Sequence, residues 1–99
     1  VMTPTECFAA LRAGADGLKF FPGVMIGTDG VKAIRAVLPT GTEVLAVGGA
    51  GPENFAEWKA AGVDGVGIGS ALFKPGYSAI EVRDRANTIV AEYDRVFGQ

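Results

Sequence analysis

Apolar residues follow two alternating kinds of pattern along this 99-residue chain. Short apolar runs at 17–21, 43–48 and 65–69 have the length of β-strands and are bracketed by glycine, proline or other turn residues. Around and between these runs, apolar residues recur every three or four positions, which predicts amphipathic helices. The predicted order is therefore α-β-α-β-α-β-α. A helix between successive strands is typical of parallel βαβ units.

Helix boundaries are marked by capping residues. Thr3 suits an N-cap, Pro4 the first helical position and Glu6 a capping box, and Gly14 stops this helix. After a loop that Pro22-Gly23 opens, the second helix is expected to begin near Thr28 or Asp29 and to end before Pro39. The third helix is expected to run from Pro52 to Gly62. The last helix is expected to begin at Ser78, with Glu81 closing a second capping box. The expected buried stripes are Phe8, Ala9 and Leu11; Val31, Ile34, Val37 and Leu38; Phe55, Trp58 and Ala61; and Val82, Ala86, Ile89, Tyr93 and Phe97.

The chain contains an internal echo, because residues 13–20 line up with residues 61–68 at two helix-to-strand junctions. Repetition of one βα unit favours a (β/α) barrel over a doubly wound sheet. The near-continuous apolar run at 43–48 predicts a strand buried on both faces, as in a parallel sheet. A whole barrel needs eight such units. We therefore expect residues 1–99 to form one domain that is the C-terminal half of a TIM (β/α)8 barrel, entered in the middle at Val1.

One strand carries a lysine. Leu18, Phe20 and Phe21 surround Lys19 in a run that Pro22 closes. An ammonium among aromatic side chains costs several kcal/mol unless it is paired, hydrated or shifted toward the neutral amine. A lysine shifted in this way is a nucleophile that forms a Schiff base with a ketone. The alternative is a lysine near the strand end that reaches water.

Two neighbouring strand ends are rich in glycine: Gly48-Gly49 and Gly69-Ser70. In a (β/α) barrel, active sites lie at the C-terminal ends of the strands, and phosphate often binds after the last two strands. Glycines let backbone N–H groups approach an anion closely. The alternative is that these glycines serve only tight turns. The pattern matches neither a P-loop nor a dinucleotide fingerprint.

Composition removes several classes of function. With a net charge of −2 and no basic cluster, the chain does not suit nucleic acid or an anionic membrane as a partner. The absence of histidine excludes a histidine triad or a histidine metal site within this chain. No cluster of acidic residues in the sequence resembles a metal-binding site. No apolar run is long enough to span a bilayer. The single cysteine, Cys7, suits a buried position and a reducing, cytoplasmic compartment. We expect no cofactor.

These motifs together resemble a known family. T-P-T-E at 3–6, L-K-F-F-P at 18–22, V-G-G at 47–49 with G-P-E-N at 51–54, and I-G-S-A-L at 68–72 resemble the C-terminal half of the 2-keto-3-deoxy-6-phosphogluconate and 2-keto-3-deoxy-6-phosphogalactonate aldolases. These are class I pyruvate aldolases, or aldehyde-lyases, on a (β/α)8 barrel. The resemblance spans nearly the whole chain and assigns it barrel strands six to eight.

The resemblance implies roles for individual residues. Lys19 is expected to be the Schiff-base lysine on barrel strand six, and Phe21 to lie on the same side of that strand near the substrate. Phosphate binding is expected at Gly48, Gly49, Gly69 and Ser70.

The resemblance also bears on the substrate. Val47 stands where gluconate-specific members have threonine, and K-P-G at 74–76 looks more like the galactonate branch. The expected reaction is cleavage of 2-dehydro-3-deoxy-6-phosphogalactonate to pyruvate and glyceraldehyde 3-phosphate, in carbohydrate metabolism. A gluconate-specific aldolase is the alternative.

One departure from the family limits the expected activity. The family's general acid/base glutamate and its carboxylate-binding arginine lie in the N-terminal half, and no residue here matches them. We therefore expect the isolated chain to be inactive or nearly so. Full-length relatives are commonly trimers, which implies a homo-oligomer. Another phosphate-binding barrel enzyme and a non-catalytic, self-associating half-barrel stay open as alternatives.

Overall fold

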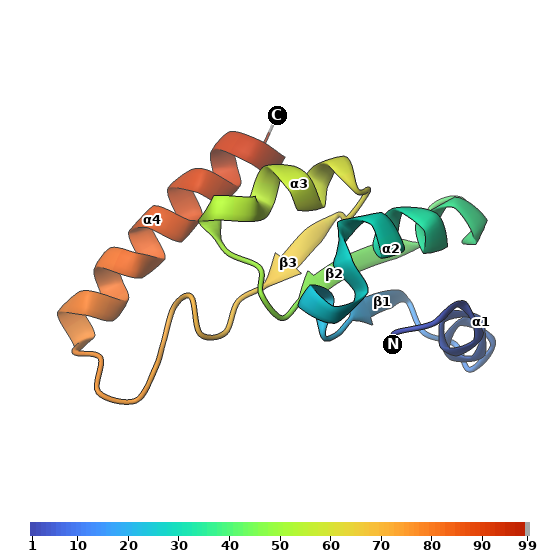
Figure 1. Ribbon diagram of the computed structural model, residues 1–99, viewed down its shortest axis with the longest axis horizontal. Helices are drawn as coiled ribbons and strands as arrows, with labels where there is room; N and C mark the ends of the chain where they lie inside the picture. Colours follow the sequence, from blue (N-terminus) through green and yellow to red (C-terminus); the bar gives the residue numbers. More distant parts are fainter. Residues whose placement is uncertain (99) are drawn as a thin grey trace.

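The structure is a computed structural model that describes residues 1–98. Three parallel strands form one sheet in the order β1-β2-β3, and helices α2 and α3 lie on the same side of it (Figure 1). The predicted alternation of helices and strands is confirmed. The elements are α1 (Pro4–Arg12), β1 (Gly17–Phe20), α2 (Gly23–Val37), β2 (Glu43–Val47), the 3-10 helix η1 (Pro52–Asn54), α3 (Phe55–Ala60), β3 (Gly65–Gly67) and α4 (Ala79–Phe97).

Each strand ends slightly earlier than its sequence pattern predicted. The first strand ends at Phe20, the second at Val47 and the third at Gly67. The register places Lys19 beside Leu45 and Val47 beside Gly67. Because paired residues in a parallel ladder project from the same face, this register decides which side chains share the open face of the sheet.

Only one face of the sheet is fully buried. Leu18 and Phe20 of β1 and Val44 and Ala46 of β2 are at most 3% exposed and form the core with residues of α2 and α3. Between them Lys19 is exposed, and Leu45 and Val47 are half-buried. The expectation that the second strand is buried on both faces is therefore wrong for this structure, because the helices pack on one face.

The first helix follows its local chemistry closely. The Thr3 hydroxyl accepts a hydrogen bond from the Glu6 N–H at 3.2 Å, and the Glu6 carboxylate accepts one from the Thr3 N–H at 3.1 Å, so the predicted capping box is confirmed. Hydrogen bonds from the Met2 N–H and then from Thr3 lower the pKa of Glu6. Cys7 is fully buried, as expected, and this burial raises the pKa of its thiol.

Helix α2 starts earlier than predicted. The segment read as a loop contains a helical turn from Gly23 to Ile26, and Gly27, with φ 75° and ψ 163°, then breaks the helix. This break explains why the sequence signals pointed to a start near Thr28. The expectation that Val37 is buried is wrong, since its side chain is 58% exposed at the helix end, whereas the rest of the predicted stripe is buried.

Helix α4 is held mainly through its C-terminal half. The Phe55 ring packs edge-on against Tyr93 and Phe97, at centroid distances of 6.1 and 6.2 Å. The first turns of α4 extend beyond the sheet (Figure 1), and its predicted stripe is only half-buried. The second capping box is half formed: Ser78 accepts from the Glu81 N–H at 3.1 Å, but the Glu81 carboxylate turns to Arg85 at 3.5 Å. No helix among residues 1–98 is long and apolar enough to cross a membrane.

Candidate functional site

A small pocket lies where the three strands end. Its volume is about 240 Å³, and it brings together six of the seven residues singled out from the sequence. Phe21 follows β1, Val47 ends β2, Gly67 ends β3, and the loops after β2 and β3 supply the remaining residues. The complete lining is Phe21, Val47, Gly48, Gly49, Ala50, Gly67, Gly69 and Ser70.

Lys19, the seventh residue, does not line this pocket. It lies on the open face of β1, two residues before Phe21. That Phe21 lies on the same side of the strand stays a prediction, because β1 ends at Phe20. Phe20 points to the opposite, buried face, and Phe21 is 53% exposed. The expectation of a lysine held among buried aromatic side chains is therefore wrong, and the reading in which it reaches water describes its position here.

The Gly48-Gly49 turn needs its glycines for backbone reasons alone. Their φ angles are +96° and +80°, a region that residues with side chains rarely adopt. The Gly48 carbonyl accepts a hydrogen bond from the Val24 N–H at 3.0 Å, which joins this turn to the start of α2. Turn geometry therefore explains these two glycines without a ligand.

Asn54 holds the same turn from the other side. Its Nδ2 donates to the Gly49 carbonyl at 2.7 Å, and its Oδ1 accepts from the Gly51 N–H at 3.0 Å. The sequence places Asn54 within G-P-E-N but does not by itself indicate this role. The available signal was an asparagine placed to form a turn three residues after a glycine.

The glycine at 69 is different from the other two. A Cβ on Gly69 would meet no atom within 4 Å, and its φ lies outside the left-handed region. Neither backbone conformation nor packing among residues 1–98 requires glycine there. The missing side chain instead leaves open space in the pocket, next to the exposed Ser70.

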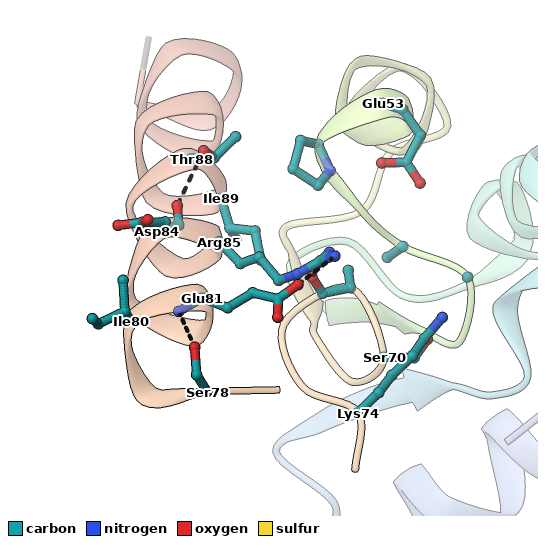
Figure 2. Close-up of a pocket in the computed structure, with 14 residues that line it drawn as sticks. Glu53, Ser70, Lys74, Ser78, Ile80, Glu81, Asp84, Arg85, Thr88 and Ile89 are labelled. Atoms are coloured by element: carbon teal, nitrogen blue, oxygen red, sulfur yellow. Dashed lines mark hydrogen bonds and ion pairs between the residues drawn. The ribbon is translucent and has the colours of Figure 1, made fainter. Parts of the chain in front are cut away.

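A larger groove adjoins the pocket. It has a volume of about 800 Å³ and lies between α4 and the loops after β2 and β3, and it shares Gly49, Ala50 and Ser70 with the small pocket. Figure 2 shows Lys74 beside Ser70 on the loop and Arg85 reaching toward them from α4. Arg85 stacks on the Tyr77 ring at 4.4 Å.

The groove mixes charges, since Lys74 and Arg85 face Glu53, Glu81 and Asp84. Such a lining has no net preference for an anion. The smaller pocket, at the strand ends, is therefore the better candidate for substrate. Among residues 1–98, no three cysteine or carboxylate side chains lie close enough together to hold a metal.

Two curated relatives match this chain over most of its length. No family model matches it. The chain is 54% identical over 98 residues to a probable 2-dehydro-3-deoxy-6-phosphogalactonate aldolase of Rhizobium meliloti strain 1021, and 46% identical over 91 residues to the enzyme of that name from Escherichia coli K12. The chain resembles the 2-dehydro-3-deoxy-6-phosphogalactonate aldolases. It spans about half the length of these relatives, 46% of the first and 44% of the second.

Solved structures agree with this resemblance. A structure described as native KDPGal superimposes on the whole chain with a TM-score of 0.94 at 42% identity, over 48% of its own length. A designed, cube-shaped protein cage made by fusing symmetric oligomeric domains matches equally well, at 0.94 and 43%, over 37% of its chain. A thiamine phosphate pyrophosphorylase from Pyrococcus furiosus matches 99% of this chain at a TM-score of 0.78 and 29% identity, over 48% of its own length.

Proposed function

We propose that this chain is the C-terminal half-barrel, strands six to eight, of a class I aldolase that cleaves 2-dehydro-3-deoxy-6-phosphogalactonate to pyruvate and glyceraldehyde 3-phosphate. The names and identities of the two relatives support the aldolase and the galactonate substrate. The three-stranded parallel sheet with its helices is consistent with half of a barrel. A homo-oligomer, and the cytoplasm as its compartment, stay predictions.

Lys19 is the proposed nucleophile. Its Nζ attacks the C2 ketone of the substrate, and loss of water gives a protonated imine. As the C4 hydroxyl loses its proton to a general base, the C3–C4 bond breaks, and its electron pair forms an enamine while the aldehyde leaves. Protonation of the enamine at C3 and hydrolysis of the imine release pyruvate and free Lys19. The general base is not assigned to any residue of this chain.

The phosphate of the substrate is proposed to bind at Gly48, Gly49, Gly69 and Ser70. The observation that carries this assignment is Gly69, whose missing side chain no feature of the fold requires. Ser70 beside it offers a hydroxyl. Phe21 and Val47 are proposed to contact the carbon chain of the substrate, because they contribute the two largest side chains in the pocket.

Borohydride trapping tests the role of Lys19. The protein at its natural full length is treated with pyruvate and borohydride, and peptide mapping by mass spectrometry locates the adduct. We expect a stable adduct on Lys19, its loss in Lys19→Arg, and no change in Lys32→Arg, which alters another exposed lysine. An unmodified Lys19 in active protein would exclude Lys19 as the Schiff-base residue.

The match to thiamine phosphate pyrophosphorylase favours a second candidate, a phosphate-binding barrel enzyme without a Schiff base. Titration with inorganic phosphate, followed by amide NMR, separates the candidates when it is combined with trapping. Shifts at Gly69 and Ser70 together with a pyruvate adduct support the aldolase. The same shifts without an adduct support the second candidate. Gly69→Ala is expected to weaken phosphate binding. Gly17→Ala is not, because it changes another exposed glycine without a left-handed φ that lies away from the pocket.

A further inference from the structure

Val47 lies against the backbone of Gly67. The two residues are register partners on β2 and β3, so they face the same side of the sheet. A Cβ on Gly67 would lie 2.6 Å from Cγ2 of Val47 and 3.3 Å from its Cγ1. The Val47 methyl groups therefore occupy the space that a side chain at position 67 would need.

This contact accounts for the glycine at 67. Its φ is not in the left-handed region, so its backbone conformation does not require glycine. The three atoms nearest to the position of its Cβ all belong to Val47. The obstacle to a side chain at 67 is thus one side chain, Val47, which is itself part of the pocket.

The rotamer of the Val47 side chain affects the shape of the pocket. Apart from Phe21, it is the only residue of the lining that is larger than serine. A valine side chain has few accessible χ1 rotamers. With a side chain at 67, the Val47 methyl groups would have to move away from β3. Such a movement would change the shape of the pocket that Val47 lines together with Phe21 and Gly69.

We propose that Gly67 is a positioning residue that holds the Val47 side chain against β3 and thereby determines which configuration at C4 of the substrate fits the pocket. This inference rests on the proposed aldolase function, in which Val47 contacts the carbon chain of the substrate and stands where the gluconate-specific enzymes have threonine. The proposed effect of Gly67 on specificity runs through Val47, which lies against β3 because residue 67 has no side chain.

The test uses the protein at its natural full length in five forms: wild type, Gly67→Ala, Val47→Ala, the double variant Val47→Ala/Gly67→Ala, and Gly17→Ala as the matched control. A Cβ on Gly17 would meet Glu43 only at an ordinary 3.4 Å. The kcat/KM is measured for the two substrate epimers at C4, the 6-phosphorylated galactonate and gluconate forms.

We expect Gly67→Ala to lower kcat/KM for the preferred epimer by about tenfold to two-hundredfold, the range for a misplaced methyl group in a substrate pocket, and to change the other epimer less. In the Val47→Ala background, the same substitution should have no further effect, because the nearest remaining atom is the Cβ of residue 47 at an ordinary 3.4 Å. Gly17→Ala should match wild type.

Methyl NMR of Val47 gives a readout that needs no substrate. The chemical shifts and χ1-dependent couplings of the Val47 methyl groups should change in Gly67→Ala and stay unchanged in Gly17→Ala. If wild type cleaves neither epimer, the proposed function fails, but a Val47 rotamer change confined to Gly67→Ala still supports the positioning role.

Three results would overturn the inference: unchanged Val47 methyl signals in Gly67→Ala, an equal loss of kcat/KM for both epimers, or the same loss with and without Val47. If Gly67→Ala does not fold, the double variant decides. Recovery of folding in the double variant supports the Val47 contact, and continued unfolding shows that another contact forbids the side chain.

Discussion

Gly23 packs closely against the backbone at the end of β2, and Gly23→Ala tests how the turn after β1 is held. A Cβ on Gly23 would lie 2.9 Å from the Gly48 carbonyl oxygen, 3.1 Å from the Val47 carbonyl oxygen and 3.3 Å from the Trp58 ring. Two of these are backbone atoms at the end of β2, so relief requires one segment to move away from the other.

Overpacking of this kind costs about 1–3 kcal/mol. Separation would also stretch the hydrogen bond from the Val24 N–H to the Gly48 carbonyl, now 3.0 Å, which contributes about 0.5–1.5 kcal/mol. We expect Gly23→Ala to lower the free energy of unfolding by about 2–4 kcal/mol. Helix propensity alone predicts the opposite sign, a gain of about 1 kcal/mol, because residue 23 begins α2.

Urea unfolding, followed by circular dichroism at equal protein concentrations, measures this difference. Gly17→Ala is the matched control, with an expected change within about 0.5 kcal/mol. Amide NMR of Gly48 and Gly49 shows whether the turn has moved. A Gly23→Ala protein at least as stable as wild type would refute the steric argument and leave propensity as the deciding term.

Three further predictions concern the rest of the fold. Phe55→Ala should lower the free energy of unfolding in urea by about 3–5 kcal/mol, because the ring is fully buried. Phe73→Ala removes a ring that is 56% exposed and should change it by less than about 0.5 kcal/mol. Equal effects would contradict this assignment of the core. The pKa of Glu6 is lowered by folding, so its contribution is present above its unfolded pKa of about 4.3 and is lost as the pH falls through the folded value. The stabilities of wild type and Glu6→Gln should therefore differ at neutral pH and converge in acid, and a constant difference would contradict this. Asp64→Ala removes the carboxylate that accepts from the Val44 N–H at 2.8 Å, so hydrogen exchange at Val44 should accelerate, while Asp64→Asn, which keeps an acceptor, should change it less.

Features that depend only on neighbouring residues, such as helix caps, could be predicted from the sequence. The first helix illustrates this, because threonine, proline and glutamate within four residues specify a capping box without help from distant residues. The parallel arrangement of the strands likewise follows from the alternation of short apolar runs with segments whose apolar residues recur every three or four positions. Gly27 is a counterexample. A glycine inside a helix can be an interruption or a start signal, and only the observed φ and ψ separate the two.

Properties that depend on which face is covered could not be predicted in this way. The run at 43–48 looks uniformly apolar, yet Val44 and Ala46 are buried while Val47 is half-exposed. The direction of Phe20 and Phe21 also depends on the position of α2 and α3, not on the aromatic rings themselves. The roles of Asn54 and Gly67 could not be predicted for a related reason, since each acts through a contact that exists only after folding.

The proposed reactivity of Lys19 also depends on whether its face of the sheet is covered. A lysine is activated as a nucleophile when its surroundings desolvate it or place another cation beside it. The exposed side chain of Lys19 is not desolvated in this structure. The general acid/base of the proposed reaction is also not assigned to any residue of this chain, and such a group contributes about 10²–10⁴-fold in rate. We therefore expect its aldol cleavage to be at least about a hundredfold slower than that of the full-length Rhizobium meliloti relative under the same conditions. Coupled detection of pyruvate gives both rates, and Lys19→Arg in the chain provides the background. Comparable rates would mean that the open face alone activates Lys19, and the argument from its exposure would then be wrong.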